Sequence, residues 1–335
     1  MKRTIFACCS IAAMLLLSQP VFAQAIKLGT LAPQNSPYYD ILRDLSESWA
    51  QISGGKIRFR IYPGGVAGDD PDMVRKMRIG QLDAALLAGS GLFEIAPEIK
   101  AFQMPMMFSN DEEWDHVRAH MAPKMEQIFE AKGFRVLLWG DAGWVYLFAQ
   151  KPVVHPDDLK PLRLFVWTGD QHILQAWRDI GYRPVPLAVN EIHSALHSGL
   201  INAYITTPLA ALSFQWFGLS KEMTGLKWAP LAGALVITEK KWQTIPDEIK
   251  ERLVRSAREA GERFLHQIRE HNTEAIRVMQ QHGLRVHDVP PDALTEWRKR
   301  FVANYPLIIG DNVPPELVAE AERIRDEYRA ARNTR

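Results

Sequence analysis

The sequence predicts an α/β protein with two domains. Short β-type runs alternate with helical stretches along the whole chain, which is typical of a sheet covered by helices. The length of 335 residues corresponds to about two domains of roughly 150 residues each. One amphipathic stretch in the second half is also too long to be a helix of a single domain.

The elements can be assigned in order along the chain. We expect a strand at residues 25–31, an amphipathic helix at 36–52 and a strand at 55–62, in which apolar residues alternate with basic ones. That alternation is typical of a strand with one buried face. The remaining elements expected are a helix at 70–79 and strands at 82–87, 134–139, 146–150, 162–167, 184–186, 203–206 and 234–238.

The longest helix is expected at residues 246–282. Its apolar residues recur mostly in steps of three or four, Pro246 suits the first turn, and Gly283 suits the C-terminal cap. About 36 residues at 1.5 Å each would extend for about 54 Å, which is longer than one such domain is wide. We therefore expect this helix to run across both lobes.

Residues 1–23 are predicted to be a signal peptide. Lys2 and Arg3 precede an apolar stretch at 5–17, and small residues follow at the cleavage positions. The apolar stretch is too short to span a bilayer. Both cysteines of the chain lie in this leader, so the mature protein has no thiol for a disulfide or a metal. An exported chain without cysteine is expected in the periplasm.

Charge and catalytic motifs exclude several classes of function. Forty Lys and Arg against 39 Asp and Glu leave a net charge of +1, so we predict no nucleic-acid partner. The pairs His116/His120 and His193/His197 have helical spacing, but neither has the order of a zinc protease. Ser90 lacks the spacing of a nucleophile elbow. We therefore predict no catalytic residue, no metal and no cofactor.

A series of short motifs suggests a family. The motifs follow in one order: Ser36-Pro37-Tyr38, Ser53-Gly54-Gly55-Lys56-Ile57, Ile61-Tyr62-Pro63-Gly64-Gly65, Gly80-Gln81-Leu82-Asp83-Ala84, Met104-Pro105-Met106-Met107-Phe108, Lys151-Pro152, Asp158-Leu159-Lys160, Ala195-Leu196-His197-Ser198-Gly199, and Trp242 with Ile245-Pro246. In these segments the mature chain resembles, over nearly its whole length, the substrate-binding proteins of TRAP transporters.

The resemblance implies a periplasmic binding protein fold of two lobes that close around a solute like a hinged clamp. One lobe would comprise residues 24–143 and 234–271, and the other 144–233 and 272–335. It also implies two partners, a small-molecule ligand and the membrane subunits of a TRAP transporter, and no catalysis. A periplasmic enzyme and a sensory protein that presents its ligand to a signalling partner remain as alternatives.

The chain departs from the family where the family binds a carboxylate. The alignment places Phe165 where members of the family have the Arg that pairs with the ligand, and Val145 where a second Arg often helps. Thr206 or Thr207 stands where an Asn is common. An unpaired buried carboxylate costs several kcal/mol, whereas a covered Phe contributes about 2 kcal/mol. We therefore expect an uncharged, apolar or aromatic ligand.

Other residues are candidates for the same site. Tyr38, Trp144 and Trp167 are expected in its wall, and Asp170 as a hydrogen-bonding group. Arg163 supports an alternative, a carboxylate ligand, because residues 163 and 165 share one face of a strand. An apolar ligand would also make an accessory periplasmic protein a reasonable partner. The tryptophans expected to pack in helices instead are Trp49, Trp114, Trp242 and Trp297.

Overall fold

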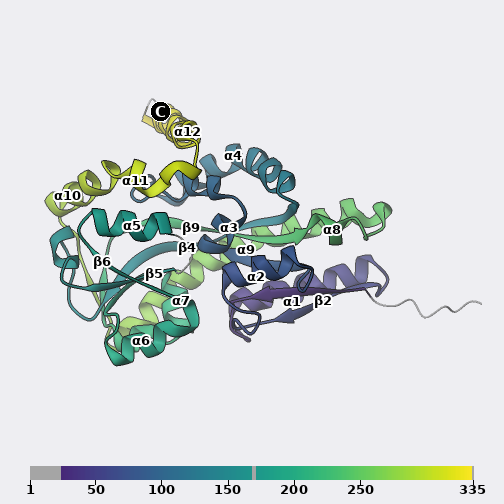
Figure 1. Cartoon of the computed structure of the whole chain (residues 1–335), viewed down its shortest axis with the longest axis horizontal. Coiled ribbons are helices and arrows are strands. Elements are labelled where there is room, and N and C mark those ends of the chain that lie inside the picture. The colour runs from purple at the N-terminus through teal and green to yellow at the C-terminus, as the bar shows by residue number, and fades with distance from the viewer. Residues whose placement is uncertain (1–23, 168–170, 334–335) are drawn as a thin grey trace, which may run out of the picture.

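The structure, a computed structural model, describes residues 24–167 and 171–333. The expected signal peptide and Asp170 lie outside these residues. Figure 1 shows an elongated molecule in which strands and the helix α9 run between two lobes. None of the helices in the described ranges is long and apolar enough to cross a membrane.

Within the described residues, ten strands form the sheet. The order of the main path is β2-β1-β3-β9-β4-β7-β5-β6, and β8 pairs with β4 and β10 beside it. Neighbours are parallel in β1–β2, β1–β3 and β5–β6, and antiparallel around β9 and β4. The strands are β1 Gln24–Thr30, β2 Ile57–Tyr62, β3 Ala84–Ala88, β4 Phe134–Ala149, β5 Arg163–Trp167, β6 Arg183–Leu187, β7 Ala203–Thr206, β8 Glu222–Thr224, β9 Ala229–Thr238 and β10 Arg285–His287.

Helices cover both halves of this sheet. In Figure 1, α1 and α2 lie at one half, and α5, α6 and α7 lie at the other. The helices are α1 Pro37–Ile52, α2 Asp70–Arg78, α3 Gly89–Ile95, α4 Asp111–Ala131, α5 Gln171–Asp179, α6 Ile192–Ser198, α7 Pro208–Ser213, α8 Glu239–Trp242, α9 Asp247–Gln281, α10 Pro291–Val302, α11 Tyr305–Ile309 and α12 Pro315–Asn333; short 3-10 turns are η1 Pro97–Phe102, η2 Pro156–Leu159, η3 Val189–Glu191, η4 Trp216–Leu219 and η5 Gly310–Asn312.

The predicted α/β fold is confirmed, and so is the long helix. The helix α9 has 35 residues and packs against β4, against α1 in the first lobe and against α7 in the second. One assignment was wrong in detail: the strands expected at 134–139 and 146–150 are a single strand, β4. It remains continuous because β-bulges after Val136 and Asp141 bend it while its pairing with β9 continues.

Gly143 and Asn272 join β4 to the long helix at the crossing between the lobes. The Asn272 amide donates to the carbonyl oxygens of Ala142 (3.0 Å) and Ile268 (2.8 Å). Its oxygen accepts the backbone N–H of Leu209 in the second lobe (3.0 Å). Gly143 has a φ of +101°, and a Cβ at this position would overlap the Asn272 amide. The close approach of strand and helix therefore requires glycine here.

The C-terminal helices divide between the lobes. In α10, Trp297 Nε1 donates to the Val154 carbonyl at 2.7 Å, which places this helix beside the loop that follows β4. The last helix, α12, instead packs against α4 of the first lobe, where Arg329 forms two hydrogen bonds with Glu113 (2.7 and 2.9 Å). For residues 315–333 the structure therefore differs from the lobe boundaries drawn from the resemblance, because this buried carboxylate of α4 holds α12 through Arg329.

Most of the helical tryptophans are core residues. Trp49, Trp114 and Trp297 are fully buried and Trp242 is 4% exposed, which confirms their expected role in packing. Trp49 stacks edge-on against Phe59 with ring centroids 5.0 Å apart. These large side chains are committed to the core and leave other aromatic residues to line any site.

The contact between Gly143 and Asn272 predicts that two glycine substitutions differ in their effect on the free energy of unfolding. Gly143→Ala should lower the free energy of unfolding by at least about 2 kcal/mol more than Gly181→Ala, because only the first displaces a hydrogen-bonded side chain. Gly181 is a matched control: its φ is +97°, and no described atom lies within 4 Å of a Cβ there. Urea denaturation of both variants measures the difference. Equal losses would show that the Gly143–Asn272 contact does not constrain the fold.

Candidate ligand-binding site

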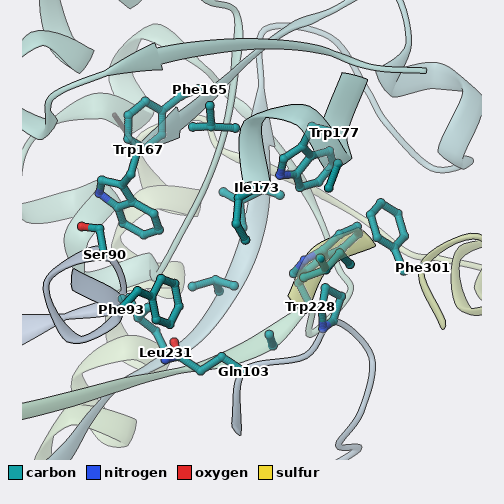
Figure 2. A pocket seen from close by; sticks show the side chains of 18 of the residues that line it. Ser90, Phe93, Gln103, Phe165, Trp167, Ile173, Trp177, Trp228, Leu231 and Phe301 are labelled. Atoms are coloured by element: carbon teal, nitrogen blue, oxygen red, sulfur yellow. The ribbon is translucent and has the colours of Figure 1, made fainter. Parts of the chain in front are cut away.

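Among the cavities between the lobes, one, here called cavity I, is mostly aromatic and aliphatic. Its empty volume is about 1010 Å³, open solvent included. Figure 2 shows Trp177, Trp228 and Phe301 gathered at one side and Trp167 and Phe93 at the other. The lining residues are Gly89, Ser90, Phe93, Gln103, Pro105, Val145, Phe165, Val166, Trp167, Ile173, Ala176, Trp177, Ile180, Ile205, Trp228, Ala229, Pro230, Leu231, Phe301 and Ile308.

The second cavity, here called cavity II, has an empty volume of about 930 Å³, open solvent included. It lies against the carboxyl ends of β1, β3 and β7, where open α/β sheets commonly bind ligands. The lining residues are Thr30, Leu31, Ala32, Pro33, Tyr38, Asp70, Leu86, Leu87, Ala88, Leu138, Gly140, Asp141, Ala142, Phe165, Trp167, Val189, Ile192, Thr206, Thr207, Ala210, Phe214, Trp216, Leu231, Gly233 and Phe264.

Three residues line both cavities: Phe165, Trp167 and Leu231. Phe165 and Trp167 are two residues apart on β5 and therefore share one face of the strand. Their rings meet edge to face, with centroids 5.7 Å apart. Leu231 comes from β9 in the middle of the sheet. We call this group the neck.

The surface of cavity I is apolar. Apart from the indole N–H groups of its three tryptophans, its only polar side chains among the described residues are those of Ser90 and Gln103. Gln103 Oε1 accepts the backbone N–H of Ala232 at 3.2 Å. Ser90 Oγ and Gln103 Nε2 are covered by neighbouring atoms and have no hydrogen-bond partner within the described ranges. A molecule in cavity I would therefore meet mainly carbon.

Asp70 brings a carboxyl group to cavity II. The residue is 3% exposed, and its Oδ2 accepts the backbone N–H of Ala88 at 3.1 Å. Burial, together with the neighbouring charge of Asp69, raises the pKa of Asp70 to about 8. At neutral pH this group is mostly protonated, so its O–H can donate a hydrogen bond.

Asp141 also lines cavity II, but its charge has a partner. Arg269 of α9 donates to Asp141 Oδ2 at 2.9 Å and forms two 2.8 Å hydrogen bonds with Asp115. Burial raises the pKa of Asp141, and the charge of Arg269 acts in the opposite direction. The guanidinium is thus engaged by carboxylates of the protein and does not line either cavity.

The hydroxyl groups of cavity II have different partners. Tyr38 Oη lies 3.3 Å from the Ala142 carbonyl oxygen and 3.4 Å from Thr207 Oγ1, and burial raises the pKa of this phenol. Thr207 also caps α7 by accepting the N–H of Ala210. The side chain of Thr206, 7% exposed, makes no hydrogen bond with another described residue.

Asp69 connects the two lobes beside cavity II. It is the N-cap of α2, and its Oδ1 accepts the N–H of Asp70 at 2.9 Å. Its Oδ2 accepts the N–H of Val189 in the second lobe at 3.2 Å. Two short helices, one in each lobe, thus direct N–H groups at a single carboxylate. Together with the contact of Tyr38 and Thr207, this carboxylate holds the lobes together around the cavities.

Comparison with known proteins establishes the family. Residues 28–308 match the family described as bacterial extracellular solute-binding protein, family 7 (DctP). The chain belongs to this family. The 2,3-diketo-L-gulonate-binding periplasmic protein YiaO of Escherichia coli (strain K12) is 23% identical over 273 residues, which are 79% of this chain and 81% of that protein.

Solved structures share the fold of this solute-binding protein. A TRAP periplasmic solute-binding protein from Xanthobacter autotrophicus Py2 with bound β-D-galacturonate superposes with a TM-score of 0.83 at 16% identity, covering 90% of this chain and 99% of that one. One from Sulfurospirillum deleyianum DSM 6946 with bound succinate has a TM-score of 0.82 at 18% identity, covering 90% and 98%. The two-lobed binding-protein fold expected from the resemblance is confirmed.

The cavities bring together most of the residues named from the sequence. Tyr38, Thr206 and Thr207 line cavity II, Val145 lines cavity I, and Phe165 and Trp167 line both. Asp170 lies outside the described residues.

Two residues named from the sequence lie elsewhere. Arg163 begins β5 at the end remote from the neck, and its Nε donates to the carbonyl oxygens of Gly199 and Leu200 (3.1 Å each) at the end of α6. The alternative in which Arg163 holds a ligand carboxylate has no support from this position, because Arg163 lines neither cavity although it shares a strand face with Phe165. Trp144 faces α4, where Nε1 donates to Asp111 at 2.6 Å, and it lines neither cavity.

Several lining residues were not identified from the sequence as site residues. Phe93, Ile173, Trp177, Leu231 and Phe301 come from three helices and a strand that are far apart in the chain. Helical periodicity could show that Ile173 and Trp177 share one face of α5, four residues apart. Only the tertiary arrangement shows that this face covers a cavity.

The buried carboxyl predicts a pH-dependent stability. The pKa of Asp70 is about 8 in the folded protein and about 3.9 in an unfolded chain, so its contribution is fully present in acid and is lost as pH rises from about 4 to 8. Between pH 5 and pH 8 the wild type should lose on the order of 3 kcal/mol of unfolding free energy relative to Asp70→Asn. Urea denaturation at the two pH values measures this, with the exposed Asp44→Asn as control. An unchanged pH dependence in Asp70→Asn would contradict it.

Proposed function

We propose that this protein is a periplasmic solute receptor for an uncharged, largely apolar ligand, which it delivers to the membrane subunits of a TRAP-type transporter. The family and the fold support the transport role, and the predicted leader supports the location. The nature of the ligand rests on one observation. No Lys, Arg or His is among the described lining residues of either cavity, and Phe165 lies at the point that both share.

The charges present favour a neutral ligand. Of the two carboxyl groups in cavity II, Asp70 is mostly neutral and Asp141 is engaged by Arg269, so a ligand carboxylate placed there would meet no cation among the described lining residues. An unpaired charge in such a buried place costs several kcal/mol. A loss of 4 kcal/mol alone would weaken a micromolar ligand to about millimolar. An acid of the kind bound in the galacturonate and succinate complexes would therefore bind poorly in these cavities.

Apolar contact supplies the favourable free energy instead. Phe165 is 5% exposed and stands where the resemblance places the Arg of the family. Because little of this ring remains exposed, the apolar gain comes from the wall as a whole, to which Trp167 and Leu231 contribute at the same place.

A single polar group gives direction to this apolar site. The Thr206 hydroxyl, without a side-chain partner among the described residues, is the group in cavity II that we assign to a hydrogen bond with the ligand. Thr207 is less suited, because the Tyr38 hydroxyl and the first turn of α7 already engage it. One such bond contributes about 1 kcal/mol and mainly fixes orientation.

Substitution at Phe165 tests the proposal. Phe165→Arg should weaken binding of the fluorescent apolar probe N-phenyl-1-naphthylamine by at least about 30-fold, because it removes an apolar contact and buries a charge. Phe165→Leu keeps an apolar side chain and should stay within about fivefold of the wild type. Fluorescence titration of the mature protein measures both variants.

A control substitution and two acidic ligands distinguish an apolar ligand from a carboxylate ligand. Arg163→Ala removes a cation outside both cavities and should leave binding of the probe unchanged. Wild-type protein that binds galacturonate or succinate but not the probe would overturn the proposal. So would a Phe165→Arg variant with unchanged affinity for the probe.

A further inference from the structure

The neck between the cavities is formed by side chains. Trp167 and Leu231 both lie over Gly89, where an added Cβ would be 3.3 Å from Leu231 Cδ1 and 3.6 Å from the Trp167 ring. Phe165 meets Trp167 edge to face on the other side. Because these groups are side chains, their rotamers can change without breaking the pairing of β5 or β9. The two cavities are therefore adjacent compartments separated by the side chains of three residues and not by backbone.

The two compartments differ in chemistry. The far wall of cavity I is an aromatic cluster, with the rings of Trp228 and Phe301 4.3 Å apart and those of Trp177 and Trp228 6.0 Å apart. Figure 2 shows this cluster on the opposite side of the cavity from Trp167. Cavity II contains the Thr206 hydroxyl and the Asp70 carboxyl. One end suits an apolar tail, and the other suits a neutral polar group.

The apolar walls of the two cavities argue against a compact ligand. Each cavity has an apolar wall of its own, and the two cavities meet at the neck. A compact molecule would fill one of them and leave the apolar wall of the other exposed to water, which is unfavourable. A long molecule would cover both walls.

We propose that the ligand is an elongated, uncharged amphiphile that occupies both cavities at once. Its apolar tail lies among Trp177, Trp228 and Phe301, its body passes the neck, and its polar end meets Thr206 and Asp70. This inference rests on the proposed function and adds the length and orientation of the ligand. The alternative is a compact apolar ligand held in one cavity only.

A series of probes tests the length. Straight-chain primary alcohols from hexanol to dodecanol would be titrated against N-phenyl-1-naphthylamine bound to the mature protein. In the wild type, affinity should rise by about fourfold for each added CH₂ through the whole series, as each newly buried group adds apolar area. A plateau at hexanol or octanol would overturn the proposal.

Two substitutions fill one cavity each. Ala176→Trp places an indole in cavity I and Ala210→Trp places one in cavity II. If the ligand spans both cavities, the affinity of each variant should stop rising at a shorter alcohol than in the wild type. The ratio of dodecanol affinity to hexanol affinity should fall at least tenfold. The control is Ala319→Trp on the exposed side of α12, which should follow the wild type.

The outcomes separate the two proposals. If only one of the two variants lowers the ratio, the ligand occupies a single cavity and the further inference is wrong, while the apolar site stands. If no alcohol displaces the bound probe from the wild type, the further inference is wrong, and if the wild type does not bind the probe at all, the proposed function fails as well. Thermal unfolding checks each variant, and Ile180→Trp, which also fills cavity I, replaces Ala176→Trp if that variant does not fold.

Discussion

The antiparallel pairing of β4 and β9 is the interaction on which the position of both cavities depends. These two strands run through the middle of the sheet, and each contributes wall to both compartments: Val145 and Ala229 to cavity I, and Gly140 and Gly233 to cavity II. The bulge between Asp141 and Trp144 turns β4 from one lobe to the other. Asn272 of α9 forms hydrogen bonds with this bend and with α7. The strands that line both cavities therefore also connect the two lobes.

The loss of water from enclosed charged groups then determines which ligands can bind in the two cavities. A charged group in a closed cleft needs a partner inside the cleft, since water no longer solvates it. Here the nearby guanidinium of Arg269 is committed to Asp115 and Asp141, and the Asp70 carboxyl is kept neutral by burial. The protein has thus retained the clamp of its family while presenting apolar side chains and neutral hydrogen-bonding groups to whatever it encloses.

Much of the fold and about half of the site follow from the sequence. Strand alternation predicted most of the strands, helical periodicity predicted α1, α2 and α9, and the motif order predicted the family, because all of these depend on local spacing. The position of a side chain along a strand was harder to predict. Arg163 and Phe165 share one face of β5, yet only Phe165 belongs to the neck. Leu231, Phe301 and Trp177 could not be identified, since nothing in their own segments shows that three distant elements meet around one cavity.

The central claim is that the enclosed ligand carries no charge, and native mass spectrometry of gently purified mature protein tests it most directly. The protein would be ionised with its co-purified ligand, and the ligand then extracted and partitioned between chloroform and water. The account predicts one neutral molecule per chain that enters the chloroform phase. A uronate or dicarboxylate recovered in the aqueous phase at the same stoichiometry would contradict it.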